Sequence, residues 1–119
     1  MGIKVHGEIV ETDKEGFLVN PDRWDEDVGE ALIKQHEADG HIPVGETARG
    51  MIGYFREHFR ENEAHPTLHN LRLILTERHG KDLHDHRAYK MFLYGLFPHG
   101  PVRMLCKLAG IPKPTDELQ

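Results

Sequence analysis

The chain has 119 residues, the length of one ordinary domain, and a core of that size buries roughly two-thirds of the unfolded chain's surface. Its 20 acidic and 15 basic side chains give a net charge of −5, which argues against a protein whose main role is to hold nucleic acid phosphates or to adhere to a membrane surface. No apolar run approaches the ~20 residues of a membrane helix, and the N-terminus lacks a secretory pattern. The single cysteine, Cys106, excludes an internal disulfide and predicts a reducing, cytoplasmic location.

Residues 1–20 favour a β-hairpin. Apolar residues alternate loosely between Ile3 and Val19, and Gly7 and Gly16 mark turns between short β-prone runs. This pattern predicts a small hairpin followed by a third extended piece. Because so small a hairpin is unstable alone in water, we expect it to lie against a larger body.

Residues 21–110 predict a bundle of about five short helices. The first is expected to begin after an N-cap at Asp25 and to stop at Gly40. The second carries the strongest amphipathic pattern, and its Gly50 and Gly53 are expected to allow close helix approach. The predicted buried stripes of the first two helices are Val28, Ala31 and Leu32, and Met51, Ile52, Phe55 and Phe59.

Proline and glycine delimit the three later helices. The third is predicted to start with Pro66 at its first helical position and to end at Gly80. The fourth should run from about residue 86 to 96, and the fifth from Pro101 through Ala109 to a stop at Gly110. The predicted buried stripes of the third and fourth helices are Leu68, Leu71 and Leu75, and Ala88, Phe92 and Leu96.

Residues 111–119 differ in kind from the bundle. Pro112 and Pro114 exclude a helix, so the segment is expected to be an extended, mobile C-terminal arm. At ~3.1 Å per residue such an arm reaches on the order of 28 Å. The sequence therefore predicts one mainly α (α+β) domain over 1–119: a hairpin region, a small orthogonal helical bundle and an arm.

Cys106 is the only soft nucleophile, and it lies near the end of the fifth helix. Arg103 and Lys107 would favour its thiolate, whereas the negative end of the helix would disfavour it. The alternative is that Cys106 is a small buried apolar residue, as single cysteines in apolar runs commonly are.

The sequence suggests two further chemistries, metal binding and DNA binding. Among the ten histidines, His79, His84 and His86 lie close in sequence around a loop, and His65 and His69 are four apart. A zinc site needs three or four converging ligands, which this spacing does not indicate, so no metal or other cofactor is expected. The third and fourth helices outline a helix-turn-helix, with basic residues at Arg72, Arg78, Lys81, Arg87 and Lys90. DNA binding through this pair is an alternative that the acidic net charge disfavours.

Motifs along the whole chain resemble the DsrC/TusE family of sulfur-relay proteins. Residues 93–101 read LYGLFPHGP and residues 106–115 read CKLAGIPKPT. The N-terminal segment is similar to the family's hairpin and the residues that follow it, at Gly7, Ile9, residues 11–13 and 15–18, and Trp24. Residues 54–57 and Pro66 also match the family at the corresponding positions. The resemblance implies a helical bundle with an N-terminal hairpin and a mobile arm. It also implies sulfur carriage, in which an arm cysteine accepts a persulfide and delivers it to a partner.

The chain departs from this pattern at the arm. Cys106 matches the helix-end cysteine that the sulfite-reductase branch uses to close a sulfur bridge, whereas Glu117 stands where the carrier cysteine belongs. A carboxylate cannot hold a persulfide. The first hypothesis is therefore a regulatory or atypical partner-binding member that meets sulfurtransferases or sulfite-reductase-like or heterodisulfide-reductase-like proteins. The alternatives are sulfur transfer through Cys106 alone and DNA binding.

Overall fold

The N-terminal hairpin forms as expected. The structure is a computed structural model that describes residues 2–80 and 85–114. Strands β1 (Gly2–Val5) and β2 (Glu8–Glu11) pair antiparallel, with Gly2 opposite Glu11. The two-residue turn between them places His6 and Gly7 at φ 53° and 80°, the positive values that a tight hairpin turn requires. A bridge between Thr12 and Leu18 forms the predicted third extended piece.

Five α-helices follow a short 3₁₀ turn at Pro21–Arg23. They are α1 (Glu26–Ala38), α2 (Glu46–Asn62), α3 (Leu68–His79), α4 (His86–Leu96) and α5 (Pro101–Leu108). Their ends follow local signals: the Asp25 carboxylate accepts the Val28 N–H at 2.8 Å, and Gly80 ends α3 in the left-handed conformation. The predicted mainly helical fold with an N-terminal hairpin is confirmed.

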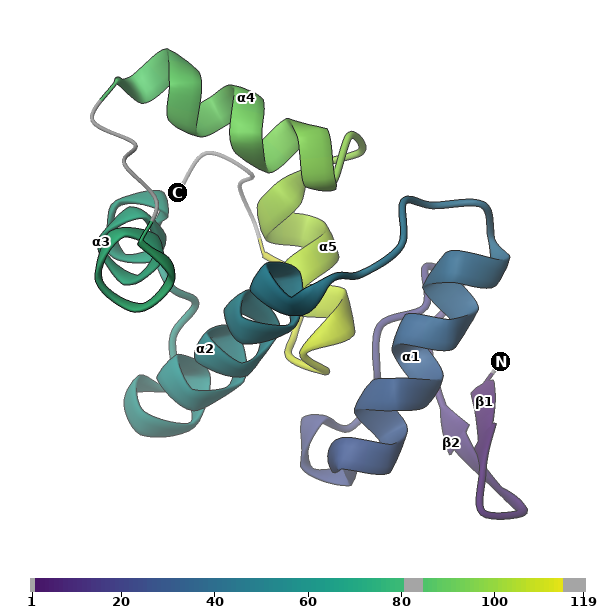
Figure 1. The fold of residues 1–119 in the computed structure, drawn as a ribbon. Helices are drawn as coiled ribbons and strands as arrows, with labels where there is room; N and C mark the ends of the chain where they lie inside the picture. The colour runs from purple at the N-terminus through teal and green to yellow at the C-terminus, as the bar shows by residue number, and fades with distance from the viewer. Residues whose placement is uncertain (1, 81–84, 115–119) are drawn as a thin grey trace.

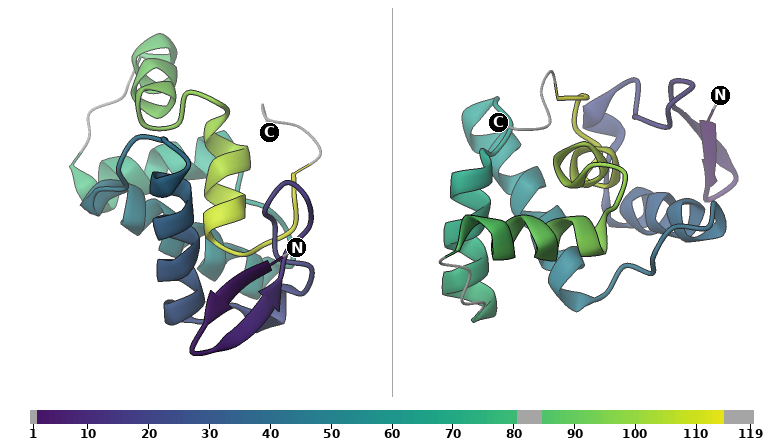
Figure 2. Two further views of the ribbon diagram at one scale, coloured as in Figure 1. Left: turned by 90° about the vertical axis from the view of Figure 1, so that its right-hand side faces the viewer. Right: turned by 90° about the horizontal axis from the view of Figure 1, so that it is seen from above.

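Helix α5 lies at the centre of the bundle. It contacts α1, α2 and α4, while β1 lies against α1, away from α3 (Figure 1). Figure 2 shows α5 beside α1, α2 and α4 from two further sides. Five of the eight α5 residues are buried: Pro101, Val102, Leu105, Cys106 and Leu108. Most of α5 therefore belongs to the hydrophobic core.

Three expectations about the helices are wrong in detail. Pro66 precedes the N-cap of α3 instead of occupying its first helical position, because Thr67 accepts the Asn70 N–H and caps the helix itself. In α4 the buried line runs through Tyr89 and Leu93, and Ala88 is exposed.

The third concerns α2, where a Cβ at Gly53 would meet no atom within 4 Å, so this glycine does not serve a close helix approach. The predicted burial of Met51, Ile52 and Phe55 in the same helix is confirmed.

The start of the C-terminal arm belongs to the body of the protein. Ile111 has no exposed surface and Pro114 is buried, whereas Pro112 and Lys113 are exposed, so the arm expected from residue 111 begins with residues that contact the body. The rest of the predicted arm, with Glu117, lies outside the described residues. Within residues 2–80 and 85–114, no helix is long and apolar enough to cross a membrane.

Candidate functional site

Cys106 lies on the buried side of α5. Its exposed fraction is 0%, and its neighbours along the helix, Leu105 and Leu108, are equally buried. The backbone carbonyl of Cys106 accepts the Ile111 N–H at 3.1 Å, and that of Lys107 accepts the Gly110 N–H at 3.1 Å. This pair of bonds is the Schellman arrangement that ends helices. Cys106 therefore sits where the helix turns into the arm, with its thiol directed into the core.

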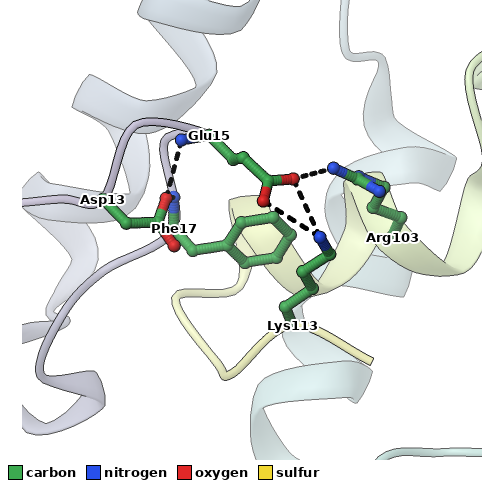
Figure 3. Close-up of polar contacts among 5 residues, drawn as sticks. All are labelled: Asp13, Glu15, Phe17, Arg103 and Lys113. Atoms are coloured by element: carbon green, nitrogen blue, oxygen red, sulfur yellow. Dashed lines mark hydrogen bonds and ion pairs between the residues drawn. The ribbon is translucent and has the colours of Figure 1, made fainter. Parts of the chain in front are cut away.

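Arg103 lies on α5 one turn before Cys106, and its side chain is half-exposed. Its guanidinium donates to the carboxylate of Glu15, in the turn after the hairpin (Figure 3). The same carboxylate accepts the Lys113 ammonium at 2.9 and 3.0 Å through its two oxygens. Glu15 thus connects three parts of the chain that are distant in sequence: the N-terminal turn, α5 and the start of the arm.

The turn that carries Glu15 is held in place on both sides. The Asp13 carboxylate accepts the backbone N–H groups of Glu15 at 2.8 Å and Phe17 at 3.0 Å, and the Phe17 ring is buried beneath (Figure 3). Lys107 covers the turn from α5: a Cβ on Gly16, whose φ is +92°, would lie 2.6 Å from the Lys107 side chain. Arg103 and Lys107, predicted as supports of Cys106, thus both lie against this turn.

A second group of side chains holds the carbonyl end of α5. The Trp24 indole N–H donates to the Leu108 carbonyl at 3.4 Å. The Arg56 guanidinium lies 5.0 Å from the Trp24 ring and donates to the carbonyls of Ala109 at 3.5 Å and Gly110 at 3.4 Å. Burial lowers the pKa of Arg56, but a guanidinium stays charged at neutral pH and complements the negative helix end.

Gly110 is required by this packing. Its φ is +69°, and a Cβ there would lie 2.3 Å from Cδ1 of the Trp24 ring. Only a residue without a side chain satisfies both the left-handed backbone and the close approach of the indole.

Two residues after Gly110, the chain contacts His65. Its Nε2 lies 2.6 Å from the Pro112 carbonyl oxygen. Since a carbonyl only accepts, Nε2 carries the proton in this contact.

Comparison with known proteins identifies the family. The DsrC family, described as DsrC like protein, matches residues 4–117. The chain belongs to this family. The sulfurtransferase TusE of Photorhabdus laumondii is 33% identical over 109 residues, covering 92% of this chain and 91% of that protein. The TusE homolog of Haemophilus influenzae is 34% identical over 116 residues, covering 95% and 96%.

Solved DsrC structures share the fold. The oxidized gamma-subunit of the dissimilatory sulfite reductase from Archaeoglobus fulgidus superposes with a TM-score of 0.76 at 31% identity, covering 96% of each chain. The DsrC of Allochromatium vinosum gives 0.75 at 30% identity, covering 97% of this chain and 96% of that one. The sulfur-relay family inferred from the motifs is therefore confirmed.

Three histidines of this DsrC family member, His36, His41 and His99, lie close together. The ring of His36 stacks on that of His41 with centroids 4.3 Å apart, and His41 meets His99 edge-on at 5.3 Å. His36 is only 2% exposed, and neither ring nitrogen has a hydrogen-bond partner in the described structure. Burial, with the nearby His41 and Lys107, lowers the pKa of His36 to about 4. Among residues 2–80 and 85–114, no three potential ligands lie close enough to hold a metal.

Two basic residues of the predicted helix-turn-helix pair make contacts within the protein. The Arg72 guanidinium lies 6.0 Å from the Tyr89 ring. Arg78 lies 3.8 Å from the Glu57 carboxylate and 6.0 Å from the Tyr54 ring. Lys81 lies outside the described residues. DNA binding through α3 and α4 stays a prediction.

Sequence reasoning missed the contacts that fix the arm. Glu15 and Lys113 are 98 positions apart, and no local pattern announces a pair at that separation. Trp24 and Arg56 appeared among the family-like residues, but nothing in the sequence indicated that they hold the end of α5. His36 was one of ten histidines with no distinguishing spacing.

Proposed function

We propose that this DsrC family member binds sulfur-relay partners without carrying sulfur on its arm. The proposal depends on which residues occupy the two positions where the family has cysteines, and on whether a thiol there is exposed. The arm position is occupied by Glu117, and the thiol of Cys106 has no exposed surface. A sulfur atom that no partner can contact does not accept a persulfide at a useful rate, because exchange needs access as well as a thiolate.

The carboxylate at position 117 gives the arm a charge but no sulfur chemistry. A partner that receives an arm thiolate or persulfide has to accommodate an anion at the end of that arm. Glu117 presents a negative charge at the same position and cannot be sulfurated. The chain would then occupy the partner's site and regulate access to it, with sulfurtransferases and reductase-like proteins of sulfur metabolism as the expected partners.

Persulfide loading tests the proposal. The protein is incubated with a purified TusE-type sulfur donor, and its intact mass is measured, each sulfur adding ~32 Da. We expect no adduct on the wild type and one adduct on Glu117→Cys, which restores the arm thiol. The doubly substituted Cys106→Ala, Glu117→Cys protein locates that adduct on the arm.

Binding completes the test. The wild type should compete with the Glu117→Cys protein for the donor, and Glu117→Gln should compete more weakly because it lacks the charge. An adduct on Cys106 of the native wild type would overturn the proposal and favour transfer through Cys106 alone. Failure of both proteins to bind any relay enzyme would also contradict it.

A further inference from the structure

A groove between α1 and α2 is lined by neither Cys106 nor the turn that carries Glu15. Both helices pack on α5, and the space between them has a volume of about 300 Å³, at the lower end of the range for ligand sites. Its apolar part is formed by Ile33 of α1, Ile52 of α2 and the partly buried Trp24 ring. The groove is therefore large enough to receive a long side chain of another molecule.

Gly53 keeps the α2 wall of this groove open. A Cβ there would meet no atom within 4 Å, and its φ is not positive, so the packing of this chain does not require a glycine. A glycine inside a helix also costs stability relative to alanine. By contrast, a Cβ at Gly29 on the α1 wall would lie 2.7 Å from the Trp24 ring. Gly29 thus serves the protein's own packing, whereas Gly53 leaves space that a second molecule can fill.

The rim of the groove is acidic. Glu26, Asp27 and Glu30 line it from α1, and Arg49 of α2 is the one arginine or lysine among the described lining residues. Asp27 contacts His6 at 2.6 Å and Glu30 binds Arg49, which leaves Glu26 without a basic partner in the described part of the chain. The Arg49 guanidinium meets both oxygens of Glu30, so this rim already accepts a guanidinium from outside α1.

We propose that the groove between α1 and α2 is a docking site for a basic segment of a partner protein. An arginine or lysine of that segment would lie along the Trp24 ring, with its aliphatic part against Ile33 and its charge near Glu26. Charge complementarity selects this occupant, because an acidic or uncharged segment would cover the carboxylates without compensating them. The inference rests on the proposed function in taking a sulfur-relay protein as the partner.

Trp24 makes the test direct, because it is the only tryptophan in the chain. Its indole N–H gives a single NMR signal, which is followed in the isotope-labelled protein as the peptide acetyl-Leu-Arg-Leu-amide is added. The control peptide acetyl-Leu-Glu-Leu-amide has the same apolar residues and the opposite charge. We expect a saturable shift with the basic peptide, at a dissociation constant on the order of 1 mM, and about fivefold weaker binding of the acidic peptide.

Two pairs of variants locate the binding. Gly53→Leu fills the groove and should weaken binding about tenfold, whereas Gly95→Leu, at an equally open position on α4, should leave it unchanged. Glu26→Gln should weaken binding about two- to fivefold, the range for one exposed ion pair. Glu77→Gln removes the same charge from an exposed position on α3 and should have no effect. Melting temperatures establish that each variant is folded.

Unchanged binding in Gly53→Leu, equal binding of the two peptides, or no shift with either would overturn the inference. The same shift with propylguanidine alone, at equal affinity, would assign the groove to a small organic cation and contradict a docking role. The same shift on raising the protein concentration without peptide would assign it to a second copy of this chain, with the same consequence. Because no relay enzyme is present, failure here leaves the sulfur-loading result for the proposed function unaffected.

Discussion

The buried ring of His36 should make this protein sensitive to mild acid. It lies near the end of α1, stacked on His41 and beside Phe97, with both nitrogens lacking a hydrogen-bond partner in the described structure. A proton added to this ring creates a buried cation, and the nearby Lys107 on α5 repels it, whereas Glu37 and Asp39 compensate only in part. Protonation is therefore far easier in the unfolded chain than in the folded protein.

The sign and size follow from the two pKa values. The pKa of His36 is about 4 in the folded protein and 6.5 in its unperturbed state. The folded protein binds fewer protons between these values, so its free energy of unfolding falls as the pH drops through that window. The loss from this one ring is about 2 kcal/mol between about pH 7 and pH 5, and about 3 kcal/mol once the pH is below both values.

Urea unfolding at several pH values measures this loss. His36→Leu replaces the ring with an apolar side chain, and its free energy of unfolding should fall by ~2 kcal/mol less than that of the wild type over the same pH range. His69→Gln, which changes an exposed histidine of α3, should behave like the wild type. The reasoning is refuted if the wild type and His36→Leu lose the same stability between neutral pH and pH 5.

Other predictions concern α5 and α2. Gly110→Ala should lower the free energy of unfolding by about 2–4 kcal/mol, because a Cβ there strains the backbone and meets Trp24. Gly53→Ala, where a Cβ meets nothing, should instead raise it by up to ~1 kcal/mol; equal melting temperatures for the two variants would contradict this contrast. Arg56→Met should cost about 1–3 kcal/mol in urea unfolding by leaving carbonyls at the end of α5 without their donor, and an unchanged midpoint would argue against that role. Alkylation of Cys106 should be slow in the native protein and fast in urea; a native rate equal to that of the unfolded chain would show that the thiol is exposed.

The sequence by itself determined most of the local structure. An N-cap at Asp25, a left-handed stop at Gly80 and the proline at the start of α5 act within one helical turn, so they can be read without knowledge of the rest of the chain. The hairpin turn at Gly7 is equally local. The family motif is also a property of the sequence alone, which is why the sulfur-relay family was predictable. The loss of the carrier sulfur at Glu117 stays a prediction.

Tertiary structure decided which side of each helix is buried and which distant residues meet. The helical period of α4 allows a face through Ala88 or one through Tyr89, and only the packing against α5 selects the second. The exposure of Cys106 could not be read from its apolar neighbours, because it depends on α5 being enclosed by three other helices. The meeting of Glu15 with Lys113 joins the two ends of the chain, and a contact over that separation is set by the folded core, which no short-range pattern encodes.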